Sequence, residues 1–428
     1  MPDPAGISDR IATAFAGRRV LVTGHSGFKG GWLCLWLAHV GAIVRGISLP
    51  PTGSRSFYAA AGIAERIDSR FADIRDEAAL RAAARDFDAE VIFHLAAQPL
   101  VRRSYAAPAD TFATNVIGTA HVLDQARTMP SLKAVIVVTS DKCYENHDWS
   151  WPYRENDRLG GTDPYSASKA CTELVAQCYR RSWFSDPDGP MLATVRAGNV
   201  IGGGDWAEDR LIPDIIRAAA AQNPMIIRNP LSIRPWQHVL EPLSGYLLVA
   251  EQMLARTSAA AEPAWNFGPS DNDAVTVEQL ARALIASAPE LDLPIRFSAD
   301  SNAPHEARTL RLDSSMAANV LGWRACLSMA STIRLTADWY THYLRGDADM
   351  AAFSCAQLAA YLGLPYAFAS HFAPQMLGEA LIDTAGIDGN APGLGLLPLV
   401  TTFEVAKTVQ RTSAAGERRG LQRCVRLA

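Results

Sequence analysis

The sequence has almost no excess charge of either sign. Lysine and arginine number 40 against 44 aspartate and glutamate residues, which gives a formal net charge of -4. A chain with this balance has no basic field to attract a nucleic-acid backbone, so we expect no nucleic-acid partner. Hydrophobic residues make up 49% and charged residues 20% of the chain, as is typical of a folded globular protein.

Long hydrophobic runs are also missing. The longest, residues 31–44, is about fourteen residues long and contains His39. A membrane-spanning helix needs about 20 apolar residues. The amino-terminal residues, with Asp3 and Asp9, do not resemble a secretory signal. We therefore expect no membrane partner and a cytoplasmic location.

Cysteines are few and show no pattern. The seven are Cys34, Cys143, Cys171, Cys178, Cys326, Cys355 and Cys424. Their number is odd and none has the spacing of a zinc knuckle, so we expect no metal site. Reduced thiols, as are usual in the cytoplasm, are the simplest interpretation.

Apolar segments alternate with Ala-rich helical segments over the first half of the chain. Buried strands are predicted at residues 19–23, 42–47, 90–95, 134–138 and 191–195, and a helix at 30–40. Near-continuous apolar strands separated by helices favour a parallel sheet covered on both faces. The predicted fold class is α/β, a doubly wound parallel-sheet Rossmann domain with a smaller mixed substrate-binding lobe.

We predict three parts along the chain. Residues 1–198 form the dinucleotide-binding domain. Residues 199–346, with Pro-containing turns and a closing helix near 331–343, form mainly a substrate lobe with returning segments of the Rossmann domain. Residues 347–428 form an appendage of unknown role, which we expect to pack loosely.

A glycine-rich turn follows the first predicted strand. Gly24, Gly27 and Gly30 permit a tight turn and a close approach of a dinucleotide pyrophosphate to the N–H groups that open the helix. Ser26 and Phe28 belong to the same loop. The sequence therefore predicts dinucleotide binding at this turn.

The residues leave the choice between NAD and NADP open. No carboxylate follows the second strand, in residues 46–50, to hold a ribose diol. Arg45 either meets a 2′-phosphate or is a solvated strand arginine. Asp73, at the end of another short strand, either accepts a hydrogen bond from an adenine amino group or caps a helix.

Tyr165 and Lys169 are four residues apart, on one face of a predicted helix. An ammonium beside a phenol stabilises the phenolate, which allows the tyrosine to move a proton. Ser140, Asp141 and Lys142 follow the apolar strand 134–138. The end of that strand opens toward the same edge of the sheet as the glycine turn.

At these positions the sequence resembles the extended short-chain dehydrogenase/reductase (NAD-dependent epimerase/dehydratase) family of nucleotide-sugar enzymes. The resemblance covers about residues 15–345. It rests on the glycine turn, His94-Leu95-Ala96-Ala97-Gln98, the Ser140/Tyr165/Lys169 set and Arg196-Ala197-Gly198-Asn199-Val200. Longer strings at 27–30, 139–146, 202–206 and 234–239 look most like the CDP-glucose 4,6-dehydratase subfamily.

The resemblance implies a lyase that uses NAD and takes a nucleotide sugar, CDP-glucose. The implied reaction oxidises C4, eliminates water across C5 and C6, returns the hydride to C6, and gives CDP-4-keto-6-deoxyglucose for deoxysugar and polysaccharide biosynthesis. Tyr165 and Ser140 serve the oxidation. Asp141 protonates the departing oxygen if burial raises its pKa. Lys142 removes the C5 proton if its pKa is lowered, and is otherwise a surface lysine.

The resemblance also implies binding residues and a homodimer. The cofactor residues are Gly24, Ser26, Gly27, Phe28, Gly30, Asp73, Ile74, Leu95, Ala96, Ala97, Asn115, Tyr165 and Lys169. The substrate residues are Gln98, Asn199, Arg228 and Arg234. For the arginines, a guanidinium fork suits two phosphate oxygens. Asn115 is otherwise a helix-packing amide, and His94 is better read as a core histidine. Trp206 and Trp236 either cover the pyrimidine or fill the lobe.

Two other functions stay open. A nucleotide-sugar 4-epimerase would use Ser140, Tyr165 and Lys169 without Asp141 or Lys142, and another sugar-nucleotide dehydratase would differ in the base that it accepts. A catalytically silent dinucleotide-binding sensor or scaffold is the alternative from another class.

The predicted appendage resembles pieces of unrelated proteins. Residues 356–374 look like part of a luciferase-like flavin monooxygenase, and residues 393–403 like part of a cobyric-acid-synthase-type amidotransferase domain. Neither piece is long enough to carry an intact site, so we assign the appendage no activity.

Overall fold

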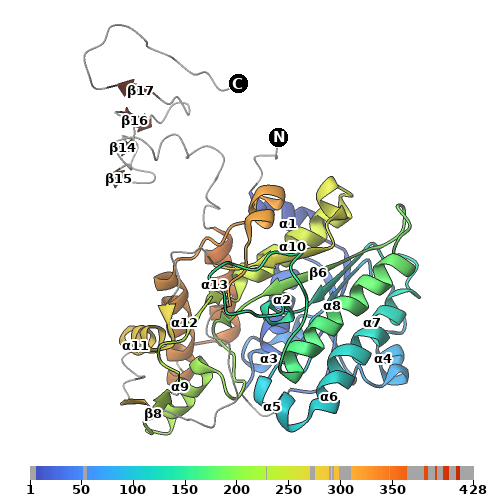
Figure 1. Cartoon of the computed structure of the whole chain (residues 1–428), viewed down its shortest axis with the longest axis horizontal. Helices are drawn as coiled ribbons and strands as arrows, with labels where there is room; N and C mark the ends of the chain where they lie inside the picture. The colour runs from blue at the N-terminus through green and yellow to red at the C-terminus, as the bar shows by residue number, and fades with distance from the viewer. Residues whose placement is uncertain are drawn as a thin grey trace. The chain divides into compact units, whose positions relative to one another are not determined.

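The protein forms two compact units in the computed structural model, Met1–Leu364 and Pro365–Ala428 (Figure 1). The structure describes residues 6–51, 55–227, 229–269, 275–288, 291, 294–297, 310–346, 348–363, 380–383, 391–392, 399–403 and 411–414.

A seven-stranded sheet organises the first unit. In the order of the sheet its strands are β11 (Ala264–Phe267), β6 (Met191–Ala197), β5 (Ala134–Val138), β4 (Val91–His94), β1 (Arg19–Thr23), β2 (Ile43–Ser48) and β3 (Asp68–Phe71). All neighbouring strands run parallel. The strand order reverses direction between β1 and β4, which is where doubly wound sheets bind ligands.

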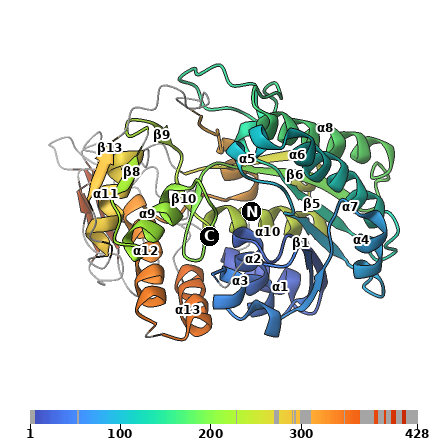
Figure 2. The same cartoon turned by 90° about the horizontal axis from the view of Figure 1, so that it is seen from below.

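Helices cover both faces of the sheet. Figure 2 shows α1 (Ile7–Phe15), α2 (Phe28–His39), α3 (Phe57–Ala60) and α10 (Leu240–Leu254) on one face. The other face carries α4 (Glu77–Ala84), α5 (Val101–Ala106), α6 (Pro108–Phe112), the π-helical turn η2 (Ala113–Ile117), α7 (Gly118–Ala126) and α8 (Pro164–Ser182). The short 3-10 turns η1 (Ile63–Glu65) and η3 (Asp141–Cys143) follow α3 and β5.

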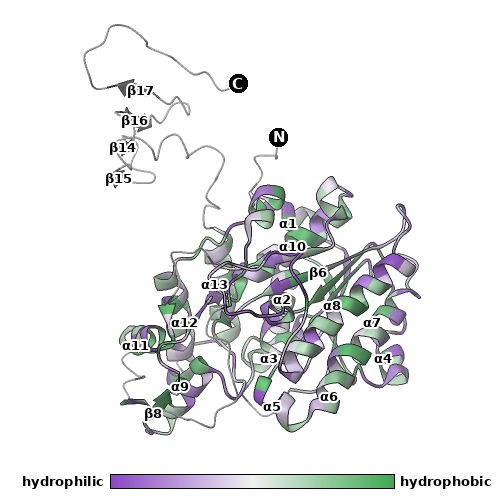
Figure 3. Ribbon diagram, in the orientation of Figure 1, coloured by the Kyte–Doolittle hydropathy of each residue, from purple (hydrophilic) through white to green (hydrophobic). Residues whose placement is uncertain are grey.

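The sheet has the apolar strands that its two covered faces require. Every residue of β4 and β5 is buried. In Figure 3, β6 is largely hydrophobic, while α7 and α8 mix hydrophobic and hydrophilic residues. The predicted Rossmann fold is confirmed, with β1 and β5 at their predicted bounds.

A smaller mixed lobe follows β6. Its helices are α9 (Leu211–Ala220), η4 (Ser258–Ala261), α11 (Val277–Ser287), η7 (Ala317–Leu321) and α12 (Met329–Arg345). Its two-stranded sheets pair β10 (Gln237–His238) with β7 (Val200–Ile201), β12 (Val275–Thr276) with β9 (Ile233–Arg234), and β13 (Ile295–Phe297) with β8 (Met225–Ile227). From this same stretch, α10 and β11 return to the main sheet, as the predicted division allowed.

The first unit continues past the boundary predicted at residue 346. Helix α13 (Met350–Leu362) packs in this unit, and its Tyr361 ring lies edge-on to Trp36 of α2, 5.7 Å between centroids. Leu358 and Tyr361 are buried. Apolar contacts of α13 therefore extend the packed unit beyond the predicted start of the appendage.

In the second unit, the described residues form a four-stranded sheet. Its strands, in sheet order, are β15 (Ala391–Pro392), β14 (Ala380–Asp383), β16 (Leu399–Phe403) and β17 (Arg411–Ala414). Within the residues that the structure describes, no helix combines the length and apolar character needed to cross a membrane.

Candidate active site

The glycine turn brings the start of α2 close to the end of β4. Gly24 has φ +79°, and a Cβ on it would lie 2.8 Å from the backbone nitrogen of Ala96. A Cβ on Gly30 would lie 2.1 Å from the carbonyl oxygen of Gly24. Gly27 is the N-cap residue of α2, and no side chain caps that helix. Its first N–H groups can therefore hold an anion such as a diphosphate.

The end of β2 carries hydroxyls and no carboxylate. The Ser48 hydroxyl donates to Ser26 Oγ at 2.8 Å, and Ser26 donates to the Leu49 carbonyl at 2.9 Å. Arg45 is buried, pairs with Asp68 at 2.5 Å and lies over the Phe87 ring. The interpretation of Arg45 as a solvated strand arginine is wrong, because burial and this pairing hold its guanidinium against the sheet; a contact with a 2′-phosphate stays a prediction.

Asp73 follows β3, and its side chain is engaged by a residue of the same short segment. Its carboxylate forms an ion pair with Arg75 at 2.6 Å, and hydrogen bonds from Arg75 lower the pKa of that carboxylate. The residue that caps α4 is Asp76, which accepts from Ala79 N. Ile74 is buried, in a core with Leu80. The contact of Asp73 with an adenine stays a prediction.

His94 belongs to the core. Its two ring nitrogens lie 2.6 Å from Thr23 Oγ1 and 2.9 Å from Thr119 Oγ1. Burial, together with the charge of Lys169, lowers the pKa of His94 to about 3. The imidazole is therefore neutral, and its role is to tie β1 to α7. Thr23 Oγ1 also accepts from Ala96 N at 3.2 Å, which fixes the loop of Leu95, Ala96 and Ala97 beside the glycine turn.

Asn115 and Gln98 hold each other. Asn115 Oδ1 accepts from Gln98 N at 2.7 Å, and Asn115 Nδ2 donates to Gln98 O at 3.1 Å and to Ser168 Oγ at 2.8 Å. The Gln98 amide donates to Leu100 O and Thr111 Oγ1 and accepts from Leu100 N. Asn115 thus joins the loop after β4 to α8, and the side chain of Gln98 is engaged by Leu100 of its own loop and by Thr111 of α6.

Ser140, Asp141 and Tyr165 lie together at the end of β5. Ser140 Oγ donates to Asp141 Oδ1 at 2.9 Å, and Ser140 is also hydrogen-bonded to the Tyr165 phenol. Burial raises the pKa of Asp141 against the opposing effects of Lys142, Ser140 and Lys29. Burial also raises the pKa of Tyr165 to about 12. The site therefore holds a buried carboxyl whose pKa is raised and a phenol, both beside the Ser140 hydroxyl.

The two lysines predicted for the site differ in their surroundings. Lys169 is buried and donates to Val138 O at 3.2 Å. Burial lowers its pKa to about 8, while the charge of Glu173 raises it. Lys142 is only half-buried, and it is its backbone N–H that bonds Ser140 Oγ, at 3.2 Å. Burial dominates the pKa of Tyr165, and the groups that oppose it are Ser140 and Arg210; the predicted lowering by Lys169 stays a prediction.

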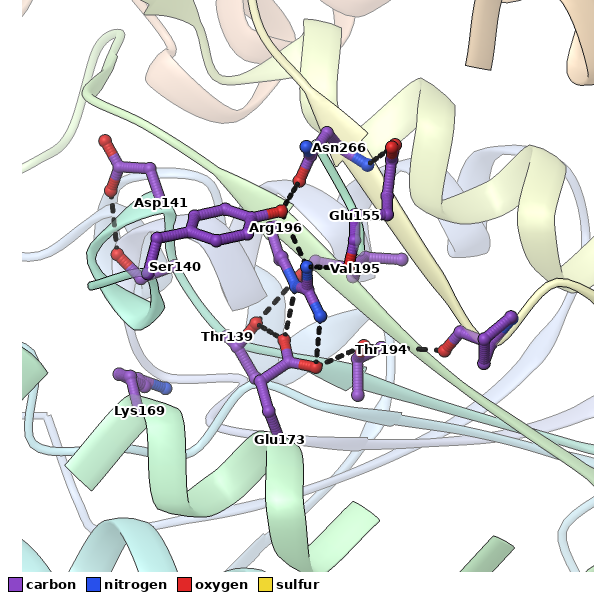
Figure 4. A network of polar contacts seen from close by, with 12 residues as sticks. Thr139, Ser140, Asp141, Glu155, Lys169, Glu173, Thr194, Val195, Arg196 and Asn266 are labelled. Atoms are coloured by element: carbon purple, nitrogen blue, oxygen red, sulfur yellow. Dashed lines mark hydrogen bonds and ion pairs between the residues drawn. The ribbon is translucent and has the colours of Figure 1, made fainter. Parts of the chain in front are cut away.

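A buried ion pair that the sequence reading missed supports these residues (Figure 4). Glu173, one turn after Lys169 on α8, accepts from Arg196 Nε and Nη2 at 2.8 Å each. It also accepts from the hydroxyls of Thr139 and Thr194. Although burial alone would raise it, Arg196 holds the pKa of Glu173 below its usual range. Glu173 and Arg196 are charged residues within elements that pack in the core, and this was the signal in the sequence from which the pair could have been predicted.

The segment that carries Asn199 passes beside Asp141. A Cβ on Gly198 would lie 3.0 Å from Asp141 Oδ2 and 2.8 Å from Pro235 Cγ. The Arg234 guanidinium donates to the Ile233 carbonyl at 3.2 Å, and the contacts of Asn199 and Arg234 with a substrate stay predictions. The Asn199 carbonyl accepts from Gln237 N at 3.0 Å. Arg228 lies outside the described residues.

The two tryptophans lie in the lobe. The Trp206 ring packs against Tyr340 and Tyr343, with centroids 5.4 Å and 5.1 Å away, and so fills the lobe. Trp236 is buried, and its indole nitrogen has no hydrogen-bond partner.

Comparison with known proteins identifies close relatives. Residues 21–336 match the family described as GDP-mannose 4,6 dehydratase. The chain is 47% identical over 350 residues to CDP-glucose 4,6-dehydratase from Salmonella typhimurium, across 81% of this chain and 96% of that one. It is 25% identical to dTDP-glucose 4,6-dehydratase from the same organism, across 75% and 92%.

Solved structures share the fold. An epimerase from Methanothermobacter thermautotrophicus superposes with a TM-score of 0.68 at 22% identity, covering 80% of this chain and 98% of that one. A dTDP-glucose 4,6-dehydratase from Bacillus anthracis in complex with NAD gives 0.63 at 18% identity, covering 78% and 98%. At these identities the likeness shows the fold alone.

A short stretch has a different relative. Over 41 residues the chain is 80% identical to cobyric acid synthase from Paracidovorax citrulli, which is 10% of this chain and 8% of that protein. The predicted resemblance to part of such a protein is confirmed, and so short a piece supports no activity of its own. The resemblance to a flavin monooxygenase stays a prediction.

Proposed function

Because the chain belongs to the GDP-mannose 4,6 dehydratase family of extended short-chain dehydrogenases/reductases, we propose that it is an NAD-dependent CDP-glucose 4,6-dehydratase. The reaction converts CDP-glucose to CDP-4-keto-6-deoxyglucose and water. The relative that acts on CDP-glucose shares 47% identity, against 25% for the one that acts on dTDP-glucose. This difference in identity supports cytosine as the base of the nucleotide sugar.

The residues around the glycine turn fit NAD. The start of α2, which no side chain caps, suits the pyrophosphate of NAD. At Gly24 and Gly30 neighbouring backbone atoms lie so close that a residue with a Cβ would not fit. Bound there, NAD would supply an acceptor for the C4 hydride of the sugar and the donor that returns the hydride to C6. The loop of Leu95, Ala96 and Ala97 borders the same turn.

Tyr165 and Ser140 serve the oxidation at C4. Tyr165 takes the proton of the C4 hydroxyl, and Ser140 holds that oxygen. Lys169, buried on the same helix face, supplies the positive charge that a phenolate requires. Ser140 Oγ donates to Asp141 Oδ1, so the hydroxyl that holds the C4 oxygen lies beside the proposed acid.

Asp141 is the residue on which the choice of a dehydratase depends. Its burial raises its pKa and so favours the protonated carboxyl, which can give a proton to the departing C6 oxygen as water forms. A 4-epimerase leaves the C6 oxygen in place and needs no such acid. Asn199 and Arg234 are proposed to hold the diphosphate of the substrate.

A panel of nucleotide sugars tests this function. Purified protein with NAD is incubated with CDP-, dTDP-, UDP- and GDP-glucose, and the products are identified by mass spectrometry. We expect loss of water from CDP-glucose and little or none from the others. Cofactor binding without turnover of any sugar would favour the sensor or scaffold. The homodimer and the cytoplasmic location remain predictions.

A further inference from the structure

Tyr144 closes the short turn that carries Asp141. The 3-10 turn η3 runs from Asp141 to Cys143, with Ser140 as its N-cap residue and Tyr144 as its C-cap residue. Tyr144 N donates to the Asp141 carbonyl at 3.5 Å, and Cys143 N donates to the Ser140 carbonyl at 3.2 Å. The placement of the Asp141 carboxyl therefore depends on what holds the two ends of this turn.

Both ends of the turn are anchored to one buried ion pair. At the first end, Thr139 Oγ1 donates to Glu173. At the second end, Arg196 Nη1 donates to the Tyr144 phenol oxygen at 2.6 Å, and the guanidinium carbon lies 4.9 Å from the centroid of the Tyr144 ring. Since Glu173 and Arg196 are bonded to each other, the turn is held at two points by a single pair.

The hydrogen bonds of the Tyr144 phenol have a fixed direction. A guanidinium can only donate, so the phenol oxygen accepts from Arg196 and gives its own proton to Asn266 Oδ1, at 2.8 Å (Figure 4). This leaves Asn266 Nδ2 to donate to the Tyr153 carbonyl at 2.9 Å. Tyr144 is buried, and burial raises the pKa of its phenol, which therefore keeps its proton.

The two chemical steps depend on different parts of this arrangement. For the oxidation, Tyr165 lies on α8 and Ser140 directly follows the Thr139 anchor. For the elimination, Asp141 opens the turn, and its own carbonyl accepts from Tyr144 N. A change at the Tyr144 phenol should therefore move Asp141 more than the two groups of the oxidation.

We propose, on the basis of the proposed function, that Tyr144 is a positioning residue for the elimination step. Its phenol oxygen, held between Arg196 and Asn266, fixes the turn of Asp141 so that the carboxyl faces the departing C6 oxygen of the sugar. In this assignment Tyr144 itself touches neither substrate nor cofactor. Misplacement of a reacting group by about 1 Å can lower a rate by about 100-fold.

Matched tyrosine variants test this role. Tyr144→Phe removes the phenol oxygen, and Tyr153→Phe makes the same change in the ring that stacks on Tyr144, 5.2 Å between centroids. Tyr153 is also buried, but its phenol bonds Asn146 and the backbone N–H of His147. Each variant is mixed with NAD and CDP-glucose in a single turnover. Absorbance measures cofactor reduction, and rapid quench with mass spectrometry measures the dehydrated product.

The phenol oxygen should matter for one step only. For Tyr144→Phe we expect cofactor reduction within about threefold of the parent rate, while dehydrated product forms about 10-fold to 100-fold more slowly. In the steady state kcat should fall while KM for CDP-glucose stays within about threefold, because the residue acts on the acid and not on substrate binding. Tyr153→Phe should keep all of these values at the parent level.

A double-mutant cycle shows whether the effect depends on the hydrogen bond to Asn266. Asn266→Leu removes the acceptor and leaves the Tyr144 ring in place, so it should slow the elimination as Tyr144→Phe does. The double variant should lie within about threefold of the slower single variant, because both changes break the same contact. If Tyr144→Phe does not fold, Asn266→Leu decides between slowed elimination alone, which supports the proposal, and unchanged elimination, which overturns it.

Other outcomes overturn the proposal. Parent rates in Tyr144→Phe, or equal losses in Tyr144→Phe and Tyr153→Phe, would make the phenol a purely structural group. Loss of cofactor reduction together with product would place the role of Tyr144 in the oxidation. A parent protein that neither reduces the cofactor nor forms product would remove the proposed function, and this inference with it.

Discussion

Glu173 and Arg196 face each other through two parallel hydrogen bonds, with both side chains no more than 4% exposed. The pair joins α8, which carries Tyr165 and Lys169, to β6. Through Thr139 it also reaches the residue before Ser140. One ion pair therefore fixes the elements that carry three of the proposed catalytic groups.

Removing one partner of this pair should be costly. Glu173→Gln leaves the Arg196 guanidinium buried without a counter-charge, so we expect the free energy of unfolding to fall by about 3–5 kcal/mol. Urea denaturation measures it. Glu278→Gln, which breaks the exposed pair with Arg282, is the control and should change stability by less than about 1 kcal/mol. Equal small effects would show that the buried pair does not hold the site.

Tyr165→Phe should abolish oxidation and spare cofactor binding. The substitution removes only the phenolic oxygen that takes the C4 proton, so we expect turnover to fall by about 100-fold to 10,000-fold. NAD affinity, measured by calorimetry, should stay within about tenfold, since one hydrogen bond contributes about 0.5–1.5 kcal/mol. Tyr179→Phe, farther along the same helix, is the control and should keep full turnover. Substantial turnover in Tyr165→Phe would contradict the role of this phenol.

Asp141→Asn should separate oxidation from elimination. The amide keeps the shape of the carboxyl and its contact with Ser140, but has no proton to give to the C6 oxygen. We expect cofactor reduction to persist while the yield of dehydrated product falls by about 100-fold or more. Rapid quench and mass spectrometry measure both. If both steps fall together, Asp141 serves the oxidation instead.

Glu241 should make stability depend on pH. This carboxylate on α10 accepts from Leu327 N at 2.6 Å and Cys326 N at 3.0 Å, and no salt bridge joins it to a residue that the structure describes. Burial raises its pKa from 4.5 to about 7. The folded state therefore binds the proton more tightly than the unfolded chain, and stability falls as pH rises from about 4.5 to about 7.

The matched variant isolates this contribution. Glu241→Gln keeps the hydrogen bonds and cannot ionise, so its stability should exceed that of the parent at pH 8 by about 3 kcal/mol more than it does at pH 4. Urea denaturation at both pH values measures the difference. Glu262→Gln, at an exposed position, is the control. Parallel pH profiles of parent and Glu241→Gln would contradict the assignment.

The sequence predicted the parts of the fold that local pattern determines. The apolar run 134–138 and the glycine turn are each specified by neighbouring residues, and both lie where expected. Strand β11 has only four residues in an irregular stretch, and it becomes a strand because it pairs with β6, about seventy residues earlier. Such pairing leaves no local pattern.

The sequence predicted which residues contribute to the site, but not which residues surround them. Tyr165, Ser140 and Asp141 were identified from spacing and strand ends, and the structure brings them together. The hydrogen bond from Trp32 of α2 to Gly203 joins residues about 170 positions apart, and no local pattern predicts that this loop folds over α2. Likewise, the pairing of Arg45 with Asp68 exists because β2 and β3 are neighbours in the sheet, which the sequence alone did not establish.

The most direct test follows the hydrogen at C4. CDP-glucose carrying deuterium at C4 is incubated with the purified protein and NAD in ordinary water, and the product is examined by NMR. The account predicts CDP-4-keto-6-deoxyglucose with that deuterium at C6. A product that keeps its C6 hydroxyl and carries the deuterium at C4, with the opposite configuration there, would contradict it.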